Sequence, residues 1–226
     1  EALNKAKNLG YAESNPSSDL NGEDVASKVK ILTALAFNSN INNKVIKIEG
    51  ITKIDHIDIR NASLLGYKIK LLGISEINNN KITQRVHPSL IDKSSYIANI
   101  DGVLNAVIVE GKPVGQTVVQ DEGAGPEATT SALVSDISSI LRGNIKFPFT
   151  ISNKKRKKIP FETINKKDFS AYLRLDVKDK HGVLSDITKI MTKNKVSIKR
   201  LIQNPYRSKK YSSIIIITHE IKDYYL

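Results

Sequence analysis

The feature that most constrains the fold of this chain is the segment 9–37, where a turn region rich in Gly, Ser, Pro, Asp and Asn runs into a strongly apolar helix pattern. At about 100° per residue, the apolar side chains of this helix form one continuous arc. The arc contains Val25, Val29, Ile31, Leu32, Leu35 and Ala36. Asp24 and Lys28 fall inside the same arc, although an amphipathic helix normally carries its charges on the opposite face.

An Asp–Lys pair four residues apart on a helix has two interpretations. On an exposed face it is a solvated ion pair that contributes little to stability. On a buried stripe the removal of both charges from water is costly, which points to a functional site. The position of Asp24 and Lys28 inside the apolar arc favours the second interpretation, so we expect a buried active-site pair.

The composition indicates a globular protein and excludes several kinds of site. The 226 residues include no cysteine, which excludes a disulfide framework, Cys-ligated zinc and a thiol nucleophile, and fits a reducing cytoplasm. The four histidines lack metal-ligand spacing, so we expect no metal site. No apolar run approaches the ~20 residues that span a bilayer, so we expect no membrane segment. The chain begins with Glu1, not Met, which leads us to expect a piece of a longer protein.

The net charge of +12 raises the question of nucleic-acid binding. Much of the excess lies in the basic run 154–158, with Lys166 and Lys167 soon after it. No aromatic stacking platform is interleaved with this run, and no zinc-finger or RNP-like motif is present. We therefore interpret it as a solvated basic linker and keep nucleic-acid binding only as a minor alternative.

Periodicity and turn residues predict an α+β protein with three regions. Residues 1–150 should form a mixed sheet covered by helices, 151–169 a basic linker, and 170–226 a second small domain with the order strand–helix–strand–strand. Expected helices cover 1–9 (ended by Gly10), 23–37 (capped by Asp19 or Asn21), 55–66, a segment capped by Thr129, Thr130 or Ser131, and 181–195; expected strands cover 45–54, 67–77, 81–91, two segments joined at 110–112, 171–179, 196–203 and 211–221.

One segment resembles a known family closely. Residues 9–28, LGYAESNPSSDLNGEDVASK, resemble the homoserine dehydrogenase pattern LGYAE-x-DP-x-x-D-x-x-G-x-D-x-x-x-K, which also precedes an apolar helix. The matching positions are Gly10, Glu13, Pro16, Asp19, Gly22, Asp24 and Lys28. Further stretches agree in order, namely EGIT at 49–52, DI at 58–59, GYKIKLLGI at 66–74, RVHPSLI at 85–91, ANIDGVLNAV at 98–107 and GAG at 123–125. LRLDVKDKHGVL at 173–184 resembles the start of an ACT regulatory domain.

The chain also departs from the family pattern. Asn15 precedes Pro16 where the family has Asp-Pro, and Asp121 and Glu122 precede the glycines of the Gly-rich loop. ATTS replaces the usual PTAS at 128–131, and His181 stands where ACT domains commonly have proline. No GxGxxG segment occurs, although family members begin with a Rossmann nucleotide-binding domain. The resemblance thus implies that this piece is inactive alone and that its ferredoxin-like ACT domain is partial.

The resemblance implies a reaction and a role for each site residue. The family interconverts L-homoserine and L-aspartate 4-semialdehyde with NADP or NAD, in the biosynthesis of threonine, methionine and isoleucine. Lys28 would transfer the proton, tuned by burial near carboxylates. Glu13, Asp19 and Asp24 would bind the substrate, and Gly10 and Gly125 would approach the cofactor. A homodimer or tetramer is expected, with an amino-acid effector such as threonine at the ACT domain.

Simpler interpretations of the same residues remain. Gly10 also suits a helix stop and Gly125 a loop hinge, while Glu13 and Asp19 alone would pass for exposed turn residues. The whole chain could be a non-enzymatic amino-acid-sensing or scaffold module that kept the fold. The presence of both Asp24 and Lys28 argues against that alternative.

Overall fold

The computed structural model describes residues 2–12, 14–41, 46–145, 151–163, 168–205 and 211–222. These residues form two compact units. The first unit comprises 1–53 and 68–161, and the second comprises 54–67 and 162–226. In the described portion of the chain, no helix is both long enough and apolar enough to cross a membrane.

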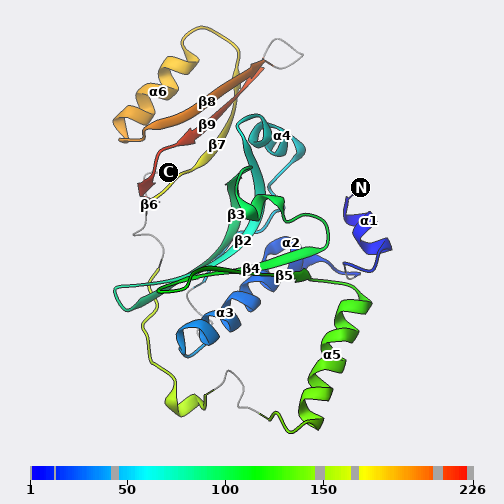
Figure 1. The fold of residues 1–226 in the computed structure, drawn as a ribbon. Coiled ribbons are helices and arrows are strands. Elements are labelled where there is room, and N and C mark those ends of the chain that lie inside the picture. Colours follow the sequence, from blue (N-terminus) through cyan, green and yellow to red (C-terminus); the bar gives the residue numbers. More distant parts are fainter. Residues whose placement is uncertain are drawn as a thin grey trace. The chain divides into compact units, whose positions relative to one another are not determined.

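The first unit combines a three-stranded sheet, a hairpin and several helices (Figure 1). Its elements are α1 (Ala2–Asn8), α2 (Ser17–Asn21), α3 (Glu23–Phe37), β1 (Lys47–Ile48), β2 (Tyr67–Asn78), β3 (Lys81–Asp92), η1 (Tyr96–Asn99), β4 (Leu104–Gly111), β5 (Gly115–Glu122), α5 (Pro126–Leu141) and η2 (Asn153–Lys155). The sheet order is β1-β3-β2, with β1 parallel to β3. Strands β4 and β5 form a separate antiparallel pair.

Helix α3 packs against the three-stranded sheet through a small apolar core. Ala26 and Val29 of α3 meet Val86 of β3, and all three are buried. Gly73 of β2 allows this close approach, because a Cβ atom there would lie 2.3 Å from Val29 Cγ2. The sheet therefore covers the side of α3 that carries Val29.

Turn residues explain where several elements end. Asn79 and Asn80 join β2 to β3, and both have the positive φ that two-residue hairpin turns require. The expected hairpin over 67–91 is confirmed. The expected cap of the helix after the Gly-rich loop is wrong: α5 begins at Pro126, with Gly125 at the N-cap. Proline is favoured at the first helical position because it lacks an N–H that would be unpaired there.

The second unit contains a three-stranded antiparallel sheet with the order β7-β9-β8. Its elements are α4 (His56–Leu64), β6 (Asp168–Phe169), β7 (Tyr172–Lys178), α6 (Val183–Lys193), β8 (Ile198–Pro205), β9 (Tyr211–Thr218) and β10 (Ile221–Lys222). The expected order strand–helix–strand–strand is confirmed by β7, α6, β8 and β9. Helix α6 covers one face of the sheet, where Met191, Ile214 and Ile216 are buried (Figure 1).

The basic run 154–158 lies along the first unit. Lys157 forms a parallel bridge with Ser39, and Phe161 forms another with Ile82. Arg156 is buried, whereas the other four basic side chains of the run are exposed. Backbone pairing thus holds 156–161 against the first unit. The domain boundaries expected from the sequence stay a prediction.

Candidate active site

Helices α2 and α3, both within residues 9–37, meet at Gly22, and we call this junction the glycine corner. Gly22 ends α2 and provides the N-cap of α3, with φ +81°. It is buried, and a Cβ atom there would lie 3.1 Å from Val86 Cγ1. The expected caps, Asp19 and Asn21, both lie within α2 instead. A glycine is needed at this corner both for its positive φ and for its lack of a side chain.

A second glycine holds the same corner from another part of the chain. A Cβ atom on Gly50 would lie 2.2 Å from the carbonyl oxygen of Leu20, so only glycine fits there. The next amide, Ile51 N–H, donates a hydrogen bond of 2.8 Å to that same oxygen. Together these contacts fix the end of α2, which carries Asp19, next to the start of α3, which carries Asp24.

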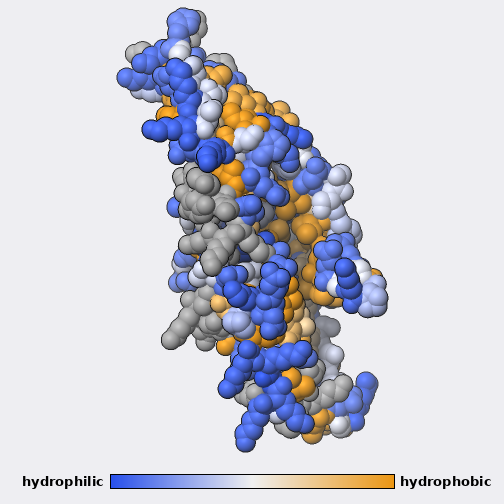
Figure 2. All heavy atoms as spheres, turned by 90° about the vertical axis from the view of Figure 1, so that its left-hand side faces the viewer, coloured by the Kyte–Doolittle hydropathy of each residue, from blue (hydrophilic) through white to orange (hydrophobic). Residues whose placement is uncertain are grey.

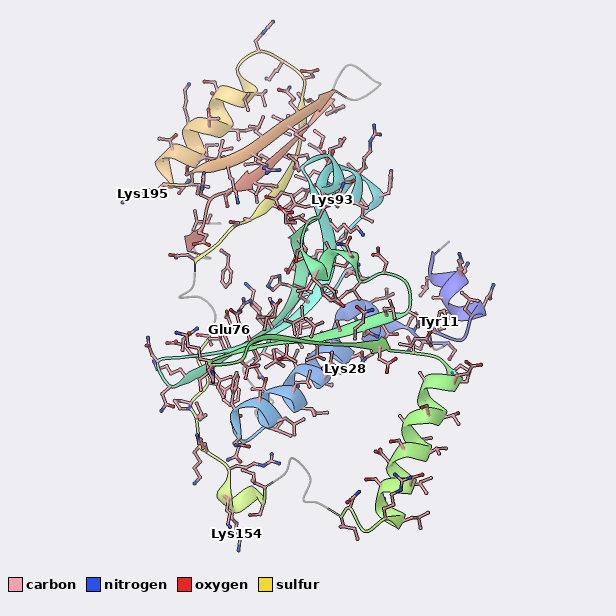
Figure 3. All side chains as sticks on the ribbon, in the orientation of Figure 1. Tyr11, Lys28, Glu76, Lys93, Lys154 and Lys195 are labelled. Atoms are coloured by element: carbon pink, nitrogen blue, oxygen red, sulfur yellow. The ribbon has the colours of Figure 1, made fainter. Side chains whose placement is uncertain are left out.

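Asp24 and Lys28 form an ion pair on the first turns of α3. Lys28 Nζ lies 2.7 Å from Asp24 Oδ2, and Figure 3 labels Lys28 on this helix. The Lys28 side chain is 59% exposed and the Asp24 side chain 39% exposed. The expectation that this pair is buried is therefore wrong for this chain. Exposed pairs of this spacing contribute about 0.3–0.5 kcal/mol, so the pair is not a major source of stability.

The reason for this difference lies in which side of α3 the sheet covers. The buried residues of the helix are Ala26, Val29, Thr33 and Ala34. Val25 of the expected apolar arc packs against the same core as Val29, whereas Ile31, Leu32 and Leu35 are 46%, 38% and 41% exposed. The ion pair therefore lies on an exposed part of α3 that also carries exposed apolar side chains.

A buried polar contact that the sequence did not reveal holds the second half of α3. Gln84 Nε2 on β3 donates a hydrogen bond of 2.7 Å to Thr33 Oγ1. Thr33 Oγ1 also lies 2.6 Å from the Val29 carbonyl oxygen and 2.8 Å from Ser75 Oγ on β2. These bonds tie α3 to two strands and so orient the turns that carry Lys28. The signal for Thr33, a polar residue on a helix face, is too common to single it out from sequence.

The two glycines expected near the cofactor come together through Tyr11. Gly10 follows α1 with φ +73°, and the amides of Gly10 and Tyr11 bond back to the carbonyl oxygens of Lys7 and Ala6. This hydrogen-bond pattern is a Schellman motif, so the expected helix stop is confirmed. A Cβ atom on Gly125 would lie 3.5 Å from the Tyr11 ring. Tyr11, labelled in Figure 3, thus joins the segment of Gly10 to the N-cap of α5.

The expected substrate carboxylates are only partly accounted for. Asp19 is exposed on α2, close in sequence to Asp24. Glu13 lies outside the described residues. The roles of Lys28, Glu13, Asp19, Asp24, Gly10 and Gly125 stay predictions.

Another charged cluster lies on β2. Asp101 accepts hydrogen bonds from Lys68 Nζ at 2.8 Å and from Lys70 Nζ at 2.7 Å. The hydrogen bond from Lys68, followed in size of effect by the one from Lys70, lowers the pKa of Asp101 to about 2. Within the described ranges, no three His, Cys, Asp or Glu side chains are grouped as a metal site would require.

Comparison with known proteins assigns the chain to a family. The family model "Homoserine dehydrogenase" matches residues 1–138. The family model "ACT domain" matches residues 171–223. The homoserine dehydrogenase of Neisseria gonorrhoeae is 38% identical over 230 residues, which cover 97% of this chain and 52% of that protein. The homoserine dehydrogenase of Helicobacter pylori is 38% identical over 219 residues, with the same two coverages.

Solved structures agree with these relatives. A homoserine dehydrogenase from Thiobacillus denitrificans superposes with a TM-score of 0.85 at 36% identity, over 99% of this chain and 52% of that one. The S. aureus homoserine dehydrogenase at pH 6.0 gives a TM-score of 0.66 at 33% identity, over 95% of this chain and 52% of that one. The chain thus spans about half the length of the relatives that it matches. By its family model, its relatives and its fold, an α+β domain followed by an ACT domain, the chain belongs to the homoserine dehydrogenase family.

Proposed function

We propose that this chain supplies the substrate-binding and proton-transfer half of a homoserine dehydrogenase. The proposed reaction interconverts L-homoserine and L-aspartate 4-semialdehyde, in the cytoplasmic biosynthesis of threonine, methionine and isoleucine. The observation that carries the proposal is the Asp24–Lys28 ion pair of 2.7 Å, which is accessible on α3 within the family motif. The exposed pair adds little to stability by itself, so the support for a role toward a ligand comes from the motif positions that Asp24 and Lys28 occupy.

Lys28 is the proposed proton donor and acceptor. In the reduction, its ammonium group gives a proton to the carbonyl oxygen of the semialdehyde while hydride adds to the carbonyl carbon. In the reverse direction, the neutral amine takes the proton from the hydroxyl group of homoserine. Asp24 keeps the side chain of Lys28 in place through the 2.7 Å contact.

The carboxylates near Lys28 are the proposed partners of the substrate ammonium group. Asp24 is in the first turn of α3 and Asp19 in α2, and the glycine corner at Gly22 holds these helices together. In aspartate semialdehyde and homoserine the ammonium group is on the α-carbon, two bonds from the reacting carbon, so carboxylates that bind it would lie near the proton donor. Glu13 completes this set in the proposal.

The backbone around Gly10 and Gly125 suits a flat cofactor ring. Among the described residues, a Cβ atom on Gly10 would meet no other heavy atom within 4 Å, and one on Gly125 would lie against the Tyr11 ring. Gly10 therefore leaves room for close approach to its backbone, whereas the Tyr11 ring already packs beside Gly125. NADP or NAD would supply or take up the hydride here. We assign no preference between the two.

We also propose self-association and an effector. Val107 and Val119 are paired across β4 and β5 and are 36% and 62% exposed. A cavity of about 450 Å³ separates this hairpin from the exposed Leu32 and Leu35 of α3. Figure 2 shows apolar residues at the surface. Such surfaces support a homodimer or tetramer, and the ACT domain supports binding of an amino-acid effector such as threonine.

The role of Lys28 is tested by Lys28→Ala in the full-length protein. Removal of the proton donor should lower kcat by roughly 10²–10⁴-fold, because a positioned general acid contributes about that much. The helix should persist, since the exposed pair adds little. Steady-state oxidation of NADPH or NADH with aspartate semialdehyde measures kcat, and circular dichroism checks the fold.

Lys189→Ala is the matched control, because Lys189 is also an exposed helical lysine paired with an aspartate, at 3.7 Å from Asp186. It should leave kcat unchanged. A near-normal kcat for Lys28→Ala would refute the proton-transfer role.

A further inference from the structure

Helix α4 belongs to the second unit, although its sequence lies between two segments of the first. The family model "Homoserine dehydrogenase" spans residues 1–138, which include α4. The structure nevertheless groups 54–67 with 162–226. Figure 1 shows α4 beside β7 of the C-terminal sheet. The helix therefore forms a covalent link between the two units.

The N-terminal end of α4 is held by a polar latch, which we define as Asp55, Asp58, Tyr172 and Arg174. Asp55 and Asp58 form a capping box, in which each side chain accepts a hydrogen bond from the other's backbone amide. Arg174 on β7 approaches both carboxylates, at 2.6 Å from Asp55 Oδ2 and 3.3 Å from Asp58 Oδ2. Tyr172 donates a hydrogen bond of 2.9 Å to Asp58 Oδ1.

The C-terminal end of α4 is held by the neighbouring strand β8. Arg200 donates a hydrogen bond to the carbonyl oxygen of Leu65, the C-cap residue of α4. Its guanidinium group lies 5.1 Å from the centre of the Tyr67 ring. A cation at a helix C-terminus stabilises the unpaired carbonyls there. Two strands of the C-terminal sheet thus hold the two ends of one helix.

The latch combines one buried carboxylate with two partly exposed charged groups: the side chains of Asp58, Arg174 and Asp55 are 5%, 25% and 42% exposed. Asp58 is only 3% exposed, whereas Ile59 and Leu64 of the same helix are 58% and 63% exposed. The hydrogen bond from Arg174 holds the pKa of Asp55 below its usual value, so the latch carries charge at neutral pH. A buried charged contact loses its stabilisation when one partner moves, because the remaining charge lacks a partner.

A short path leads from α4 to the proposed active-site helix. Gly66, with φ +86°, and the C-cap residue separate α4 from β2, and β2 crosses the boundary between the units after its first residue, Tyr67. Farther along β2, Gly73 faces Val25 and Val29 of α3 at close range. Strand β2 therefore connects the latched helix to the helix that carries Asp24 and Lys28.

We propose that α4 is a coupling helix, which the latch fastens to the C-terminal sheet so that changes in this sheet pass through β2 to α3. The coupling rests on the contacts of α4 and β2 alone. Its consequence for catalysis rests on the proposed function of Lys28. Arg174 and Tyr172 are thus positioning residues, since they act through α4.

The test compares hydrogen–deuterium exchange in the full-length protein and in Arg174→Gln. Loss of the charged hydrogen bonds should speed exchange of the α4 amides at least tenfold. Coupling predicts an increase of about fivefold in the first half of β2 and in α3. Asp55→Asn keeps a good N-cap and should show a similar pattern. The double variant should differ little from either single variant, and Arg174→Lys should restore much of the protection.

Lys189→Gln on α6 is the matched control, because it removes an exposed ion pair from the same unit and should change none of these rates. Faster exchange confined to α4, or no change at all, would overturn the coupling. If Arg174→Gln loosens β7, β8 and β9 as well, Tyr172→Phe decides: faster exchange in α4, β2 and α3 supports the proposal, and unchanged exchange overturns it. A full-length protein without dehydrogenase activity would overturn the proposed function and leave this result intact.

Discussion

Gly73 shows how a missing side chain determines the exposed face of a helix. The strand position itself is ordinary, but a Cβ atom there would lie 2.3 Å from Val29 Cγ2 and 2.8 Å from Val25 Cγ1. Because Gly73 has no side chain, this side of α3 can pack directly against β2. Asp24 and Lys28 lie beside this contact and keep exposed fractions of 39% and 59% for their side chains. One glycine in β2 thus contributes to the accessibility of the proposed proton donor.

Gly73→Ala should destabilise the first unit by about 1–3 kcal/mol, because added methyl groups in a packed contact force side chains and backbone apart. Gly111→Ala is the control, since it also lies in a strand but a Cβ atom there would meet no other heavy atom within 4 Å. Urea denaturation measures the free energy of unfolding. Equal stability of the two variants would contradict the close-packing role of Gly73.

At the scale of elements, an amphipathic pattern predicts a helix more reliably than it predicts burial. In α6, Val183, Ile187 and Met191 face the C-terminal sheet, whereas Ile190, next to Met191 in sequence, is 61% exposed. In α5, the spacing of Leu133, Ile137, Ile140 and Leu141 gives an apolar stripe along the helix. Among the described residues, however, none of α5 is buried. The pattern thus predicted the helix but not its exposure.

Met191→Ala should cost about 2–5 kcal/mol, because it leaves a cavity among Ile214, Ile216 and their neighbours. Ile190→Ala should change the free energy of unfolding by no more than about 0.5 kcal/mol. Both substitutions remove a large side chain from adjacent positions of α6, so thermal or urea denaturation compares them directly. A larger loss for Ile190→Ala would contradict the observed face of the helix.

At the scale of the whole molecule, the two units are interleaved in sequence, because 54–67 belongs to the second unit. In the described part of the chain, the face of the β4–β5 hairpin that carries Val109 and Val119 is also exposed, at 49% and 62% for these two residues. Exposed apolar surface next to an open cavity favours contact with another copy. Neither feature can be seen from a single helix or strand, because both depend on how distant segments of the chain are grouped.

Val119→Lys should weaken self-association of the full-length protein at least tenfold, because a charge replaces an apolar contact on the hairpin face. Val114→Lys is the control: Val114 is 80% exposed in the turn between β4 and β5. Analytical ultracentrifugation over a concentration series measures both. An unchanged association constant for Val119→Lys would exclude the hairpin face from the interface.

The sequence alone determined most elements of this protein and the family of its first segment. Glycine and asparagine positions predicted the end of α1 and the β2–β3 turn, because positive φ is a local requirement. Spacing within the 9–28 motif identified the candidate residues, because those residues are neighbours along the chain.

Only the tertiary structure decided which face of α3 is buried and where α4 belongs. The burial of α3 depends on Gly73, which is distant in sequence, and not on the helix's own periodicity. The docking of α4 depends on Tyr172, Arg174 and Arg200, more than 100 residues away. A helix is buried on the side that meets another folded part of the same chain. The residue pattern of the helix does not say which part of the chain that will be.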